Sequence, residues 1–302
     1  MSETIEDRLK KVKHGQASTF ELKEIIYALQ SQVERLENTI QVYRNKIGLQ
    51  NKDENSVYIA LKDLYDFKDV SDSTKQTEYA QQLEQRLIGI GPISSGVIQK
   101  IADYICEKKP FHCLEAGVFL TKLIEACDEQ EIILQLKNGS QIRDFGSYLN
   151  VDKQILIKGD IGDFSFYGMH KGMVIVKGDV GLHCGKKMNN GEILVKGKAK
   201  EYCGAEMKGG KITIYKDVDE LCGIENNGGI IEVKGNAKPG CGKDMKNGTI
   251  IIMGSIPGWV NSYNSIEFLR GGIIKIYGDH EPVIGTCYGG EIYYQDIRIY
   301  PK

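Results

Sequence analysis

Hydrophobic residues follow different patterns in the two halves of the chain. In the first half they recur every three or four residues, as in EYAQQLEQRL and GVIQKIADYICEKK, which is the spacing of amphipathic helices. In the second half they gather in short runs such as MVIVKG, EILVKG and IIEVKG, separated by glycines. Short apolar runs between turn residues are typical of strands. The pattern predicts a helical N-terminal half and a strand-rich C-terminal half that begins near residue 131.

A heptad seam crosses the N-terminal segment. Branched residues occupy its a positions and mostly leucine its d positions, which favours a parallel two-stranded coiled coil. We expect residues 1–50 to form a coiled-coil helix that pairs the protein with a second copy of itself as a dimer. The alternative is that the stripe packs on the chain's own middle segment. The seam residues are Leu22, Ile26, Leu29, Val33, Leu36, Ile40, Tyr43 and Ile47.

Residues 51–130 predict a small helical domain with one distinctive turn, Leu87-Ile88-Gly89-Ile90-Gly91-Pro92. A helix–GIGP–helix arrangement is similar to a helix-hairpin-helix, in which backbone amides such as those of Gly89 and Gly91 hold a nucleic-acid phosphate. The flanking segments carry acidic residues as well as basic ones, so no basic face is formed. A tight turn between two packed helices is therefore favoured over nucleic-acid binding.

The C-terminal half repeats itself at a fixed interval. Gly172, Gly191, Gly210, Gly229 and Gly248 share one frame, and Cys184, Cys203, Cys222 and Cys241 share another. A constant period of about 20 residues indicates a solenoid, and each unit has too few strands for a propeller blade. We expect residues 131–302 to form a right-handed parallel β-helix of about seven rungs, with about 19 residues in each. Glycines should mark its corners, where φ is often positive.

The repeat resembles a known family. The pattern G-D-V-G-x-x-C-G-x-x-M-x-x-G-x-I-x-V-x-G is similar to the Gly-rich (GXGXG) β-helix shared by two proteins. These are the C-terminal domain of the glutamate synthase large subunit and the C subunit of formylmethanofuran dehydrogenase. The lead-in, Gly139–Gly146 and then Ile155–Asp160, looks like the entry to that domain in glutamate synthase. The resemblance covers about residues 131–302. It implies a supporting domain that packs against catalytic parts and carries no chemistry, so no catalytic residue is transferred.

The four in-frame cysteines admit two interpretations. Thiolates are the ligands of choice for iron–sulfur clusters and soft metals. A stack with about 4.8 Å between rungs, however, spreads the first and fourth sulfur atoms over about 14 Å, too far for one cluster. Cysteine also behaves as a small buried hydrophobic residue. We therefore expect Cys184, Cys203, Cys222 and Cys241 to serve packing, with thiol redox chemistry and metal binding as the alternatives. No cofactor is expected.

Composition narrows the setting further. The net charge of −2 gives no global field toward nucleic acid, and no apolar run reaches the roughly 18 residues of a membrane span. A charged N-terminus in place of a signal peptide favours a cytoplasmic protein, in which the eight cysteines are thiols or ligands rather than disulfides.

One rung is longer than the others. The step from Gly248 to Gly272 exceeds the regular interval, and the insertion carries Trp259, Tyr263 and Phe268. Insertions in solenoids often form the binding face, so these aromatic residues are candidates for docking a partner; a cap over the end of the helix is the alternative.

Three functional hypotheses follow. The first is a non-catalytic structural subunit whose β-helix scaffolds a homo-oligomer or a larger enzyme complex. The second is an oxidoreductase-associated subunit, of the glutamate synthase or formylmethanofuran dehydrogenase type, with functional thiols or a substrate groove. The third is nucleic-acid binding through the GIGP turn.

Overall fold

The structure, a computed structural model, describes residues 87, 93–107, 114–137, 142–256, 266 and 268–301. The predicted coiled coil of residues 1–50, the GIGP turn with Gly89 and Gly91, and the aromatic residues Trp259 and Tyr263 lie outside this part of the chain.

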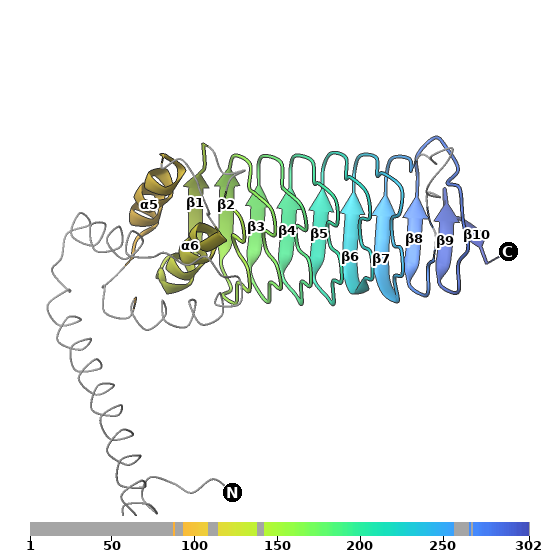
Figure 1. The fold of residues 1–302 in the computed structure, drawn as a ribbon, viewed down its shortest axis with the longest axis horizontal. Coiled ribbons are helices and arrows are strands. Elements are labelled where there is room, and N and C mark those ends of the chain that lie inside the picture. The colour runs from red at the N-terminus through yellow and green to blue at the C-terminus, as the bar shows by residue number, and fades with distance from the viewer. Residues whose placement is uncertain are drawn as a thin grey trace, which may run out of the picture. The chain divides into compact units, whose positions relative to one another are not determined.

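A sheet of ten strands runs through the described residues in sequence order (Figure 1). Strands β1 to β9 pair in parallel, each one turn after the last, and β10 closes the sheet antiparallel to β9. The strands are β1 (Glu131–Gln135), β2 (Gln154–Lys158), β3 (Met173–Val176), β4 (Glu192–Val195), β5 (Lys211–Ile214), β6 (Asn227–Val233), β7 (Asn247–Ile252), β8 (Ile273–Ile276), β9 (Glu291–Tyr294) and β10 (Ile297–Tyr300).

The predicted parallel solenoid is confirmed, with about eight turns rather than the seven that the repeat indicated. The difference arises at the N-terminal end. The step from Glu131 to its partner Gln154 is longer than the repeat interval, so counting the repeat missed a turn whose backbone stacks like the others.

Inward-facing side chains of the sheet form two continuous apolar columns. Because the side chains of a strand alternate between its two faces, every second residue enters the interior, and each of these is at most 1% exposed. In-register pairing stacks each on its equivalent in the next turn. One column is Ile155, Val174, Ile193, Ile212, Ile231, Ile250, Ile274 and Ile292; the other is Ile157, Val176, Val195, Ile214, Val233, Ile252 and Ile276.

Two series of glycines serve different needs. Gly191 and Gly210 lie at corners with φ of 93° and 81°, as expected. A second series, Gly178, Gly197, Gly235 and Gly254, shares another frame in which Lys216 takes one position. A Cβ at Gly197 would overlap the carbonyl oxygen of Gly178, so at this position the backbones of successive turns approach too closely for a side chain.

Two helices pack at the N-terminal end of the solenoid. Helix α5 (Ser95–Glu107) buries one face, formed by Val97, Ile98, Ile101, Ala102 and Ile105. The side chain of Gln99 accepts from the amide of Gln135 at 2.7 Å and donates to its carbonyl at 3.0 Å. A side-chain amide thus pairs with the edge strand β1, which protects an edge that could otherwise recruit another strand.

Helix α6 (Leu114–Ala126) is fixed to the first turn by polar contacts as well as apolar ones. The Thr121 hydroxyl accepts from the amide of Gly146 at 2.7 Å. The ammonium group of Lys153, whose residue is only 8% exposed, donates to the carbonyls of Ile124 and Cys127. A cation at the C-terminus of a helix satisfies carbonyls that lack intrahelical partners.

The C-terminal edge ends in a hairpin. Gln295 and Asp296 have φ of 47° and 63°, the signature of a two-residue type I′ turn. Strand β10 is short, its pairing with β9 shifts register after Arg298, and Pro301 follows it. These are devices that discourage edge-to-edge aggregation.

A column of buried methionines is interrupted at one position, Asn226, and this exception leads to a prediction. Met188, Met207 and Met245 each place Cε beside a corner glycine of the following turn, whereas Asn226 occupies the equivalent slot before Gly248. Asn226 is fully buried and its Nδ2 has no hydrogen-bond partner. We expect Asn226→Met to raise the free energy of unfolding by about 1 kcal/mol or less. Removing the unsatisfied buried Nδ2 and filling the slot should outweigh the loss of the hydrogen bond that Oδ1 accepts from the amide of Gly228 at 2.9 Å. Urea unfolding followed by circular dichroism measures this, and a destabilised variant would contradict it.

Candidate functional site

The four in-frame cysteines form one buried column along the solenoid. Cys184, Cys203, Cys222 and Cys241 are each 0% exposed. Their backbones are linked from turn to turn: the amides of Gly204, Gly223 and Gly242 donate at 2.8–2.9 Å to the carbonyls of the first three cysteines in order. We call these four residues the thiol column. Ser165 holds the same position one turn earlier, where the amide of Gly185 donates to its carbonyl.

The thiols act mainly on one another. Hydrogen bonding with Cys203, together with burial, raises the pKa of Cys184; Cys203, Cys241 and burial raise the pKa of Cys222. The pKa of Cys203 is lowered because both neighbouring thiols donate to it. No cationic side chain contributes to the pKa of these three groups. A reactive thiol needs an electropositive and partly exposed setting, so this arrangement is suited to packing.

A second column, of rings, lies on the flank of the solenoid. The His183 ring stacks on Phe164 with centroids 4.5 Å apart and on Tyr202 at 4.7 Å, with ring planes tilted by 18° in both pairs. The guanidinium of Arg143 lies 5.3 Å from the centroid of Phe164. Both faces of the His183 ring are therefore covered, one by Phe164 and the other by Tyr202. The stack stabilises adjacent turns and leaves His183 no open face for a ligand.

His183 gives a pH-dependent prediction. Burial, and secondarily the charge of Lys186, lower the pKa of this imidazole, and its Nδ1 has no hydrogen-bond partner. The neutral form is thus favoured in the folded state, so stability is full above the unfolded pKa of about 6.5 and is lost as the pH falls below it. We expect the unfolding free energy of the native chain to fall more between pH 7.5 and pH 5.5 than that of His183→Phe, which keeps the stack.

Urea unfolding of both proteins at each pH measures the difference. Burial raises the pKa of Asp144 to about 6, which favours folding at low pH. This contribution to the pH dependence is the same in both proteins and cancels when they are compared. Equal pH dependence in the two proteins would show that His183 is not held neutral.

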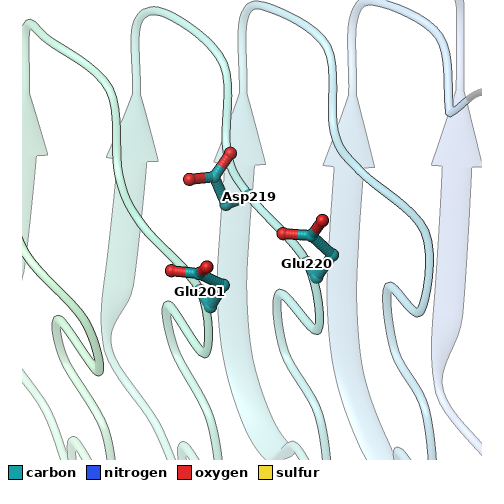
Figure 2. A group of neighbouring side chains, drawn as sticks. All are labelled: Glu201, Asp219 and Glu220. Atoms are coloured by element: carbon teal, nitrogen blue, oxygen red, sulfur yellow. The ribbon is translucent and has the colours of Figure 1, made fainter.

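Three carboxylates approach one another on neighbouring turns. Figure 2 shows Glu201 on one turn and Asp219 and Glu220 on the next, with carboxylate oxygens within 4.8 Å of one another. Oxygen ligands of this kind suit hard divalent cations. The Lys238 ammonium, however, lies 2.8 Å from Asp219 and 3.4 Å from Glu220. The lysine pairs with two of the three carboxylates, so we assign this cluster as an ion-pair network.

The outer face of the sheet carries a third column, which is apolar and partly exposed. Ile133, Leu156, Ile175 and Leu194 are in register on β1 to β4; Ile133 is 53% exposed and the others are half-buried. We call these four residues the aliphatic column. A lysine follows two residues after each of the last three members: Lys158 after Leu156, Lys177 after Ile175 and Lys196 after Leu194. We call these three lysines the lysine column. An apolar patch rimmed by polar groups marks an interaction site.

Phe268 is the one predicted docking residue within the described part of the chain. Its ring stacks with Tyr288 at 6.4 Å between centroids, and the ammonium of Lys243 lies 5.2 Å from its centroid. The ring is thus engaged with neighbours on adjoining turns. The described residues include no helix that is both long and apolar enough to cross a membrane.

Comparison with known proteins gives no assignment. No protein-family model matches the chain, and a search of the curated proteins finds no match either.

Proposed function

We propose that the protein is a non-catalytic assembly subunit, in which the solenoid is a rigid support and the outer face of its sheet holds a partner. The observation that carries this proposal is the contrast between the two sides of the sheet. The thiol column is sealed in the interior, whereas the aliphatic column stands on the outside with Ile133 more than half exposed. Nucleophiles need access to substrate, and interfaces need exposed apolar area.

The parallel solenoid also supports a relationship to the Gly-rich β-helix family. In that family the domain packs against catalytic parts, and the glycine and cysteine frames described above match its repeat. The assembly is either a homo-oligomer or a larger enzyme complex. We propose the heptad residues Leu22–Ile47 as the contact between copies.

Two measurements test the proposal. The mass of the natively purified protein, by light scattering, should be at least twice the 33.7 kDa of one chain. Under the same native conditions iodoacetamide should leave all four residues of the thiol column unmodified, as read by peptide mass spectrometry, while half-exposed Cys287 reacts. A protein of single-chain mass would contradict the assembly role. Rapid modification of the thiol column would instead favour the oxidoreductase-associated alternative.

A further inference from the structure

We propose that the aliphatic and lysine columns together form a docking face for an amphipathic α-helix of a partner protein, with acidic residues along one flank of its apolar stripe. This inference rests on the proposed assembly function and names the chemistry of the partner.

The aliphatic column has a defined length, which limits what it can bind. It ends where Leu194 pairs with Thr213, a residue only 4% exposed on the same outer face. Polar contacts take over from this point: Lys211 and Lys234 both pair with Glu232, and the ammonium of Lys196 lies 3.3 Å from the ring centroid of Tyr215. The uninterrupted aliphatic column is therefore confined to β1 to β4, and the exposed apolar residues beyond it, Tyr215, Ile230 and Met253, do not continue it.

The spacing of the column matches one face of a helix. Its side chains repeat at about 4.8 Å, so the four span about 14 Å. Apolar residues at i, i+4, i+7 and i+11 of an α-helix repeat at about 5.5 Å and span about 16 Å. A helix lying across the strands, along the solenoid axis, can thus set one apolar side chain against each turn. A β-strand lying in the same direction would place the side chains of one face about 6.6 Å apart. That spacing differs more from the roughly 4.8 Å repeat of the column than the helical spacing does, so fewer side chains would match successive turns.

Positive charge lies along only one flank of the aliphatic column. Lys158 and Lys177 are exposed, and neither forms an ion pair with any residue that the structure describes. The opposite flank of the column holds Glu131, Gln154, Met173 and Glu192. Exposed ion pairs add little affinity but select between partners and fix orientation. A helix with carboxylates on the lysine side is favoured, and one with lysines there is repelled.

A binding experiment with the full chain tests this inference. The probe is a fluorescein-labelled helical peptide of about 18 residues with leucines at i, i+4, i+7 and i+11 and a glutamate one position after each leucine. A second peptide replaces those glutamates by lysines. Fluorescence anisotropy should show the glutamate peptide binding at least about tenfold more tightly than the lysine peptide.

Variants identify the face that binds. Ile133→Ser with Ile175→Ser should weaken binding of the glutamate peptide by about tenfold or more. Lys158→Glu with Lys177→Glu should reverse the preference, so that the lysine peptide binds more tightly. Lys208→Glu with Lys246→Glu makes the same change of charge at exposed positions that precede β5 and β7 and lie outside both columns, and should leave the preference unchanged. Urea unfolding of each variant verifies that the fold is retained.

Three outcomes would overturn the inference: no binding of the glutamate peptide, equal binding of both peptides, or binding that the Ile133 and Ile175 variant does not weaken. Binding to vesicles of mixed phosphatidylglycerol and phosphatidylcholine, with both peptides ignored, would assign the face to lipid and would overturn it as well. If the peptides fail while the native protein still has more than the mass of one chain, the docking assignment fails and the assembly role stands.

Discussion

Gly210→Val should lower the free energy of unfolding by about 3–5 kcal/mol, the largest effect that we expect from a single substitution outside the apolar columns. Gly210 has φ of 81°, a conformation that a β-branched residue adopts only with strain. A Cβ at this position would also lie 2.7 Å from the carbonyl oxygen of Gly191 and 2.8 Å from Cε of Met188. Turn-to-turn stacking leaves no room to relieve the contact with Gly191, because that oxygen belongs to the backbone of the preceding turn.

Urea unfolding followed by far-ultraviolet circular dichroism measures the loss. Lys208→Val is the matched control: it introduces the same side chain two residues away, at an exposed position, and should change the unfolding free energy by less than about 0.5 kcal/mol. Because a solenoid can unfold turn by turn, the slope of each transition must be compared as well as its midpoint. Equal effects of the two valines would show that the corner tolerates a side chain.

Ile212→Ala should cost about 2–5 kcal/mol, as expected for a large-to-small change in a packed core. Ile212 is fully buried and pairs in register with Ile193 on one side and Ile231 on the other. Its removal leaves a gap within a continuous column, and the neighbouring turns are held in place by their own backbone hydrogen bonds, which limits how far the gap can collapse.

The outer face supplies the control for this substitution. Leu194→Ala removes a similar aliphatic group from the neighbouring strand at a half-buried, outward position and should cost about 1 kcal/mol or less. The same urea experiment compares the two. A cost for Leu194→Ala as large as that for Ile212→Ala would mean that the outer column is part of the core and is not available to a partner.

Much of the solenoid could be predicted from the sequence, because residues with special structural requirements recur in it at a fixed interval. The regular spacing of Gly191 and Gly210 marks corners of positive φ, and the in-frame Cys184 and Cys203 mark a buried column. These positions fix the register of the strands between them. Where the spacing changes, as in the longer step from Glu131 to Gln154, counting failed and one turn was missed.

The turns between the corners were beyond prediction. His183 and Lys187 have φ of 60° and 57°, a conformation that non-glycine residues adopt rarely. Nothing in their side chains signals it. The backbone is held there by hydrogen bonds to neighbouring turns, such as that from the amide of His183 to the carbonyl of Glu201 at 3.0 Å. The ring stack of Phe164, His183 and Tyr202 depends on this conformation and was missed with it.

The aliphatic column was missed although the sequence carries a signal for it. Runs such as MVIVKG and EILVKG have apolar residues at consecutive positions, so that Ile175 and Leu194 face outward between inward-facing neighbours. Strands that are apolar on both faces are buried on both faces in most parallel sheets. Applied to each strand, that rule would have indicated a face that awaits a covering partner.

The sealed thiols and the docking face both require that successive turns lie directly over one another, and distances across several turns test this most directly. Spin labels on p-acetylphenylalanine, which leave the native thiols untouched, can be placed at outward positions that share one register. The pair Lys158 and Lys234 lies four turns apart, and the pair Lys158 and Tyr277 six turns apart. Pulsed electron paramagnetic resonance should give backbone separations of about 19 Å and about 29 Å, a step of about 4.8 Å per turn. Separations that do not grow in proportion to the number of turns would contradict the stacked solenoid, and with it the sealed thiols and the docking face.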